Sequence, residues 1–157
     1  MPMSDPDGPY LFDVGVVALA HADTPVSDPA LSYVRRAITG EIDAIVPYPA
    51  LFGAHIVLTN YYRFSNADAS RLMGNFMDAQ RVHWCGEMPE RRVRAAFERA
   101  EEMNVDGWDG YYAEVAVREG AETVLTVDSD FDVLQEVDTE VLLTPAEHRR
   151  LAEFLGY

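Results

Sequence analysis

The sequence predicts an α/β fold with a mostly parallel sheet, and three observations support this prediction. Short apolar segments rich in β-branched or aromatic residues alternate with longer amphipathic segments. Turn and capping residues separate these segments. The chain has 157 residues, of which 48% are hydrophobic, so a single domain with a sizeable core is expected. We expect residues 1–9 to form a flexible acidic tail and residues 10–157 to form the domain.

The first half of the chain predicts two strands, each followed by a helix. The apolar segments 10–12 and 43–46 have the composition of strands, and they end at Asp13 and Pro47. A further helix begins at Pro29, because proline fits the first helical turn without the loss of a hydrogen bond. In chain order, the predicted helices cover residues 14–20, the segment from Pro29 to Gly40, and the segment from Pro47 to Tyr62.

The second half predicts four helices and two strands. Apolar residues recur every three or four positions in the first two helices, which is typical of helices that pack one face on a sheet. Thr144 and Glu147 form a capping box before the last helix, with Pro145 at its first position. In chain order, the elements are helices over 66–82, 89–103 and 111–117, strands over 123–127 and 141–143, and a helix that ends at Leu155.

The chain is strongly acidic. It has 27 acidic residues and 12 basic residues, all of them arginine, which gives a formal net charge of −15. Dispersed acidic residues keep a protein soluble in concentrated salt, so we expect an origin in a high-salt cytoplasm. An ordinary acidic protein from a GC-rich genome is the alternative. At about 1 M salt the Debye length is roughly 3 Å, so an acidic surface would not exclude nucleic acid as a partner.

We expect a cytoplasmic protein without membrane contact. The single cysteine, Cys85, has no partner for a disulfide within the chain. No apolar segment approaches the ~20 residues that a membrane helix needs. The N-terminal residues lack the basic and apolar regions of a signal peptide.

Acidic residues follow two of the predicted strands. Asp13 comes directly after the first strand, and Asp128 and Asp130 come after the third. Asp109 lies at the start of the helix that leads into the third strand. Because the carboxyl ends of parallel strands meet at one edge of a sheet, we expect these four carboxylates to converge. A hard cation such as Mg²⁺ relieves the repulsion between them and can activate water against a phosphodiester.

Other interpretations of the same residues stay open or fail. The segment 128–130 is also a typical polar turn, and Asp106 is a stronger candidate than Asp109 for the helix cap. An EF-hand loop that starts at residue 128 fails, because Val133 and Thr139 stand where that loop needs glycine and glutamate. The histidines are dispersed without an HExxH pair, which argues against a zinc site.

Two segments, FDVGVVALA and DGWDGYYAEVAVREGAETVLTVDSDFDVL, resemble the PIN domain family, which includes the VapC-type toxin ribonucleases. They share with that family an aspartate that ends the first strand, an aspartate that opens a late helix, and a T-x-D-x-D-F signature. The resemblance covers residues 10–143. It implies a single three-layer domain in which helices flank a central, mostly parallel sheet of five strands.

The resemblance also implies an activity and partners. Members of the family include Mg²⁺- or Mn²⁺-dependent endoribonucleases that cleave single-stranded RNA, often as toxins that form homodimers and pair with a small antitoxin protein. Asp13, Asp109 and Asp128 match the catalytic metal ligands of the family, and Asp130 matches a further acidic ligand.

The sequence departs from the family pattern at two positions. The family usually carries a glutamate on the helix after the second strand, where this chain has no acidic residue and His55 lies nearest. A polar residue often stands two positions after the first aspartate, and here that residue is Gly15. The alternative is therefore a PIN-like binding or assembly module with a weakened metal site. A receiver-type domain fits poorly, because it needs a lysine and the chain has none.

Overall fold

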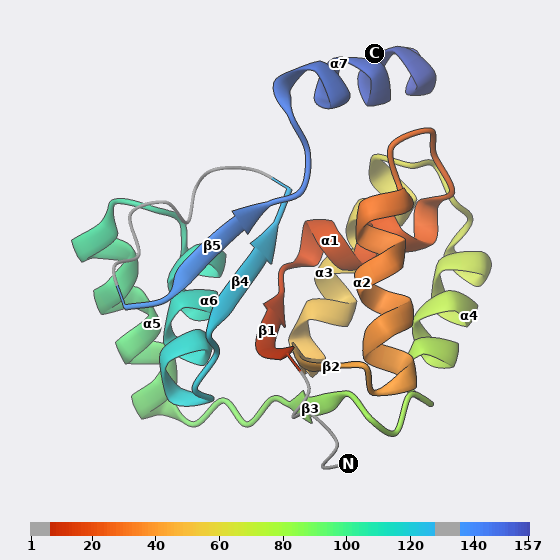
Figure 1. Ribbon diagram of the computed structural model, residues 1–157. Helices are drawn as coiled ribbons and strands as arrows, with labels where there is room; N and C mark the ends of the chain where they lie inside the picture. The colour runs from red at the N-terminus through yellow and green to blue at the C-terminus, as the bar shows by residue number, and fades with distance from the viewer. Residues whose placement is uncertain (1–6, 128–135) are drawn as a thin grey trace.

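The computed structural model describes residues 7–127 and 136–157. Its centre is a five-stranded sheet in the order β3-β2-β1-β4-β5, and every neighbouring pair of strands is parallel. Helices α1 to α4 form one group and α5 and α6 form a second group on the other side of the sheet (Figure 1). The predicted three-layer α/β fold with a parallel five-stranded sheet is confirmed.

The elements follow the predicted order except at β3, which lies between α4 and α5, where the sequence analysis placed no strand. The strands are β1 (Asp7–Phe12), β2 (Ile42–Pro47), β3 (His83–Cys85), β4 (Thr123–Thr126) and β5 (Asp138–Val141). The helices of the described residues are α1 (Val14–Ala22), α2 (Asp28–Thr39), α3 (Tyr48–Asn60), α4 (Asn66–Phe76), α5 (Glu90–Met103), α6 (Gly107–Arg118) and α7 (Pro145–Leu155).

Several boundaries differ from the sequence prediction. Strand β1 begins at Asp7, three residues before the expected start of the domain, and residues 1–6 lie outside the described residues. Helix α4 ends at Phe76, so Val82 does not belong to its buried face. Strand β5 lies over 138–141 and not over 141–143, because it is a polar edge strand whose pairing with β4, and not its composition, defines it.

The neighbouring strands β1 and β4 both contribute fully buried side chains to the core. Leu11 and Phe12 of β1 and Val124 and Leu125 of β4 are fully buried. The parallel register pairs Leu11 with Val124 and Phe12 with Leu125, so β1 ends one residue before the end of β4. Burial of each such side chain contributes about 1.5–3 kcal/mol. The core therefore fixes the carboxyl ends of the two strands that precede the predicted aspartates.

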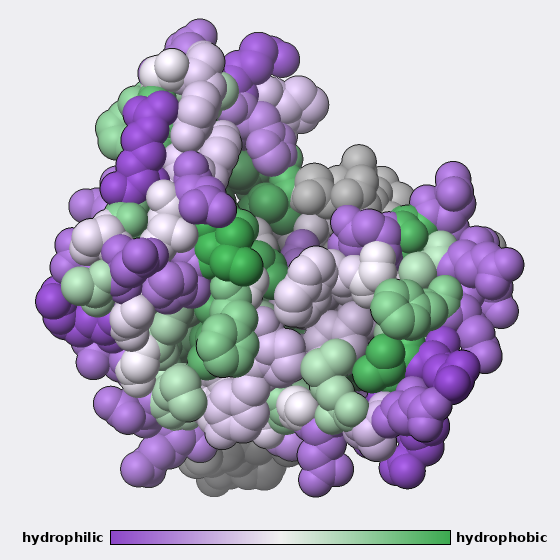
Figure 2. Space-filling view, turned by 180° about the vertical axis from the view of Figure 1, so that it is seen from behind, coloured by the Kyte–Doolittle hydropathy of each residue, from purple (hydrophilic) through white to green (hydrophobic). Residues whose placement is uncertain are grey.

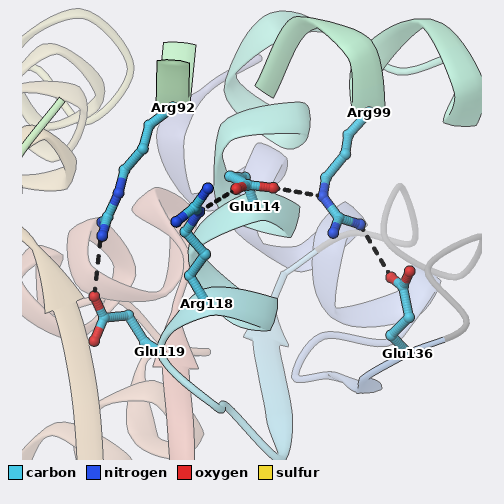
Figure 3. Close-up of polar contacts among 6 residues, drawn as sticks. All are labelled: Arg92, Arg99, Glu114, Arg118, Glu119 and Glu136. Carbon is cyan, nitrogen blue, oxygen red and sulfur yellow. Dashed lines mark hydrogen bonds and ion pairs between the residues drawn. The ribbon is translucent and has the colours of Figure 1, made fainter. Parts of the chain in front are cut away.

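A group of charged residues joins α5 to α6 (Figure 3). The carboxylate of Glu114, a residue only 6% exposed, accepts hydrogen bonds from Arg99 Nε at 2.8 Å and from Arg118 Nε. Arg99 also pairs with Glu136 at 3.1 Å. Burial acts to raise the pKa of Glu114, but the hydrogen bonds from Arg118 and Arg99 outweigh it, and the pKa lies below its usual value of 4.5.

We expect Glu114→Gln to lower the free energy of unfolding at pH 7 by about 2 kcal/mol. Removal of one partner from a fully buried pair costs about 3–5 kcal/mol, and the cost is smaller here because the side chains of Arg99 and Arg118 are 22% and 39% exposed. The folded-state pKa of Glu114 is depressed, so its contribution is complete above the unfolded pKa and is lost as the pH falls through the folded pKa.

Urea denaturation of both proteins at pH 7 and at pH 3 measures this effect. The difference between wild type and Glu114→Gln should shrink at pH 3. Glu98→Gln on the exposed face of α5 is the matched control, and it should change the stability little at either pH. A difference of equal size at both pH values would contradict the role assigned to the Glu114 carboxylate.

Within residues 7–127 and 136–157, no helix combines the length and the apolar character needed to cross a membrane.

Candidate functional site

Asp13 stands between the end of β1 and the start of α1. Its backbone N–H donates to Leu125 O at 3.0 Å, which ties it to β4. Its Oδ1 accepts from the backbone N–H of Val14 at 2.6 Å, and its Oδ2 accepts from Thr126 Oγ1 at 2.9 Å. Asp13 is thus the N-cap of α1, where the helix dipole favours negative charge. Both carboxylate oxygens are held in a fixed orientation.

Asp109 lies in the first turn of α6. Helix α6 begins at Gly107, four residues earlier than predicted, because Asp106 caps it: Asp106 Oδ1 accepts from the backbone N–H of Asp109 at 2.9 Å. Asp106 is therefore the cap, as the sequence favoured. Asp109 stands on the same helix end, where the positive end of the helix dipole stabilises a carboxylate.

Asp13 and Asp109 line one pocket with a volume of about 470 Å³. The fully buried Tyr112 also lines it. Burial raises the pKa of Tyr112 well above its ordinary value, and the negative charges of Asp13 and Asp109 act in the same direction. The Tyr112 phenol is therefore neutral and lies within electrostatic reach of both carboxylates. The structure brings together these two predicted residues, which are far apart in the sequence.

Asp128 and Asp130 lie outside the described residues. Their chain neighbour Val127 lines the same pocket as Asp13 and Asp109. The backbone carbonyl of Val127 forms a hydrogen bond with Nε2 of His148 at 2.6 Å. The structure thus leads the chain to the pocket immediately before Asp128. The ligand roles of all four aspartates stay predictions.

The pocket has further polar and aromatic residues that the sequence analysis missed. They are Tyr61, Tyr62, Trp108 and His148. Helix α7 contributes His148 and lies beyond the ends of β4 and β5 (Figure 1). Tyr157, just after α7, stacks on Tyr61 with ring centroids 5.2 Å apart and donates from its hydroxyl to Tyr61 O at 2.9 Å. The capping box in the sequence predicted that α7 forms, but it does not predict which part of the protein α7 packs against.

Helix α3 contributes no acidic side chain to the pocket. It presents Gly53, Ile56 and Val57 there, whereas His55 forms a hydrogen bond with Ser70 Oγ of α4 at 3.0 Å. A Cβ atom at Gly53 would lie 2.7 Å from Val14 Cγ2, so α3 and α1 pack too closely at this point for a larger side chain. His55 therefore does not replace the glutamate that the sequence lacks.

Gly15 also has a packing role. A Cβ atom at this position would lie 2.6 Å from Val127 Cγ2. The absence of a side chain lets the end of β4 approach the first turn of α1. A side chain at position 15 would therefore require Val127 to move.

The donor set of the pocket fits a hard cation. Asp13, Asp106 and Asp109 supply carboxylate oxygens, and no thiol is among the described lining residues. Mg²⁺ and Mn²⁺ prefer such oxygen ligands. His148 is the one described lining residue with an imidazole, and its Nε2 is already hydrogen-bonded to a backbone carbonyl. The carboxylate oxygens of the pocket are of the donor type that Mg²⁺ and Mn²⁺ prefer in proteins.

No protein-family model matches the sequence, and no curated protein matches it. Among solved structures, the chain is similar to PAE2754 from Pyrobaculum aerophilum, with a TM-score of 0.59 and 18% identity over 95% of this chain and 96% of that one. It is also similar to FitAcB from Neisseria gonorrhoeae, with a TM-score of 0.57 and 15% identity over 85% of this chain and 97% of that one. These similarities support a PIN-like fold.

Proposed function

We propose that the protein is an endoribonuclease that cleaves single-stranded RNA with the help of Mg²⁺ or Mn²⁺. The observation that supports this function best is the meeting of Asp13 and Asp109 in one pocket of a PIN-like fold. In the proposal, Asp13, Asp109 and Asp128 are the catalytic metal ligands and Asp130 is a further ligand. The bound cation would supply Lewis-acid chemistry, which lowers the pKa of water and stabilises negative charge on the phosphate.

The residues around the carboxylates prepare the site for this chemistry. Val14 N–H and Thr126 Oγ1 hold the two oxygens of Asp13, so the carboxylate needs little reorganisation. Tyr112 forms a buried wall and stays neutral at physiological pH. Trp108 is 47% exposed beside the pocket and offers an aromatic face on which an unpaired base can stack. Single-stranded RNA presents such bases, whereas a duplex does not.

We further propose that the protein is a cytoplasmic toxin of a toxin–antitoxin pair, that it forms a homodimer and that a small antitoxin protein binds it. Apolar side chains reach the surface between hydrophilic regions on the face seen in Figure 2. Phe52 and Ile56 stand one turn apart on α3 and are 76% and 56% exposed. Such exposed apolar residues are typical of surfaces that a partner chain covers.

Metal removal tests the proposed activity. We expect the purified protein to cleave a fluorescently labelled single-stranded RNA in the presence of Mn²⁺, to stop when EDTA is added, and to resume when Mn²⁺ is restored. The assay should be run over a range of salt concentrations because of the strongly acidic surface. The same RNA annealed to its complement should be cleaved much more slowly. Cleavage that continues in EDTA would contradict a metal-dependent mechanism.

A binding or assembly module with a weakened metal site is the second candidate. The absence of an acidic residue on the pocket face of α3 favours it. Calorimetric titration with Mn²⁺ separates the two functions. If Mn²⁺ binds and the Asp13→Asn substitution weakens that binding, the result supports the nuclease. If no binding is seen at millimolar Mn²⁺, the result supports the binding or assembly module.

A further inference from the structure

A second group of metal-binding side chains lies away from the aspartate pocket. His83 and Cys85 belong to β3, and Glu119 follows the last residue of α6. Their imidazole nitrogen, thiol sulfur and carboxylate oxygen all lie within 4.8 Å of one another. The three residues line a pocket of about 460 Å³, which shares no described residue with the aspartate pocket.

The fold places these side chains together. Residues two apart on a strand project from the same face, so His83 and Cys85 point the same way. Trp84 between them packs against Phe76 at a centroid distance of 5.1 Å and donates from Nε1 to Ala79 O at 3.0 Å. The pairing of Val46 with Trp84 fixes β3 as an edge strand beside β2. The His-x-Cys segment is thus held in one register.

Glu119 is oriented through both of its carboxylate oxygens. Its Oε2 lies 3.1 Å from His83 Nε2. Its Oε1 lies 4.0 Å from Arg92 NH1, and Figure 3 shows this second contact. The side chain of Glu119 is 23% exposed, so the pocket is open to ions from solution. One oxygen of Glu119 thus lies near the Arg92 guanidinium, and the other lies against the imidazole of His83.

We propose that His83, Cys85 and Glu119 bind one transition-metal cation of the Zn²⁺ type. A mixed nitrogen, sulfur and oxygen donor set suits Zn²⁺ and Co²⁺, whereas Mg²⁺ prefers oxygen alone. With bonds of about 2.0–2.3 Å, tetrahedral ligand atoms lie roughly 3.3–3.7 Å apart. Side chains whose ligand atoms are already within 4.8 Å reach that spacing by small rotations. The fourth position faces the pocket and takes a water molecule.

Metal binding at these three residues would change their protonation and charge. The Cys85 thiol gives its proton to solvent and becomes a thiolate. The proton that His83 Nε2 donates to the Glu119 carboxylate also leaves Nε2, and the neutral ring then carries its proton on Nδ1, so that Nε2 is free to bind the metal. The hydrogen bond between His83 and Glu119 is replaced by one bond from each residue to the metal. The thiolate and the carboxylate neutralise the two positive charges of the cation. The metal then links the edge strand β3 to the end of α6, which are otherwise joined there by the single His83–Glu119 contact among the hydrogen bonds of the described residues.

The proposed site differs from the zinc motif that the sequence analysis considered. Only one histidine takes part, and its partners are the lone cysteine two residues away and a glutamate from a different element. The short spacing between His83 and Cys85 does not form a recognisable zinc motif by itself. The third ligand becomes visible only when the sheet and α6 are in place.

Cobalt titration of untagged, metal-free protein tests the proposal. Thiolate ligation of Co²⁺ produces a charge-transfer band in the near ultraviolet, and the aspartate pocket cannot produce it because its described lining residues include no cysteine. We expect the band to saturate at one equivalent of Co²⁺ and to disappear when Zn²⁺ is added. Mn²⁺ should not displace the cobalt. Zn²⁺ should also raise the melting temperature.

Substitutions assign the ligands. Cys85→Ser should abolish the band, and His83→Gln and Glu119→Gln should weaken Co²⁺ binding and remove the stabilisation by Zn²⁺. His55→Gln is the matched control and should bind Co²⁺ like the wild type, because His55 contacts Ser70 outside both pockets. Circular dichroism of each metal-free variant checks that it folds. His83 is exposed, so His83→Gln should fold even if Cys85→Ser does not fold. Folded wild-type protein without the band, or a band unchanged in His83→Gln and Glu119→Gln, would overturn the proposal.

Discussion

Asp13→Asn should lower the rate of metal-dependent RNA cleavage by about 10²–10³-fold or more, which is the cost of removing one group that stabilises charge in a transition state. The substitution removes a negative charge from the proposed metal site but preserves the size of the side chain. Asparagine is a good N-cap, and its Oδ1 can still accept from the backbone N–H of Val14. The loss should therefore come from the chemistry and not from unfolding.

The measurement is the initial rate of cleavage at saturating Mn²⁺, together with circular dichroism and a melting curve. Asp43→Asn is the matched control, because Asp43 is exposed on β2 and does not line the aspartate pocket. It should cleave RNA at the wild-type rate. An Asp13→Asn preparation as active as the wild type would show that the cleavage comes from a contaminating nuclease.

Local signals predicted the helices well because capping is a short-range effect. Thr144 Oγ1 accepts from the backbone N–H of Glu147, and Glu147 Oε1 accepts from the backbone N–H of Thr144, both at 3.1 Å. Ser65 caps α4 and Asp106 caps α6 through the same kind of contact. Each of these contacts involves residues within one turn, so the sequence order alone specifies it.

Strands at the edges of the sheet were harder to predict. Strand β3 covers only His83–Cys85, which is too short to show an alternating pattern, and no part of it is as apolar as the central strands. Strand β5 is polar over Asp138–Val141, and only its register with β4 defines it. In both cases the pairing with a neighbouring strand makes the segment a strand, and this pairing is a tertiary property.

The candidate site likewise contains residues that the sequence predicted and residues that only the tertiary structure reveals. Asp13 was predictable because it directly follows a buried strand, and Asp109 was predictable because the topology of a parallel sheet brings that helix end back to the strand ends. His148 was not predictable, because it reaches the pocket from α7 through a contact with Val127 O. The absence of an acid on α3 was visible in the sequence, whereas the close packing of Gly53 on Val14 is visible only in three dimensions.

Gly110→Ala should lower the free energy of unfolding by about 3 kcal/mol, the upper part of the usual cost of overpacking. A Cβ atom at Gly110 would lie 2.3 Å from Ala96 O and 2.8 Å from Ala100 Cβ. Neither contact involves a side chain that can rotate away, so α5 and α6 must move apart. At about 2–4 °C per kcal/mol for a chain of this size, the melting temperature should fall by roughly 6–12 °C.

Gly74→Ala provides the matched control for this prediction. Gly74 lies inside α4 with no atom within 4 Å of the position that its Cβ would take. Alanine should therefore stabilise the protein there by about 0.5–1 kcal/mol, through the better helix propensity alone. The same propensity gain acts at Gly110, so opposite signs for the two variants would isolate the cost of the close contact between α5 and α6. Stabilisation by both variants would mean that the two helices separate easily, and the start of α6 would then not hold Asp109 rigidly beside Asp13.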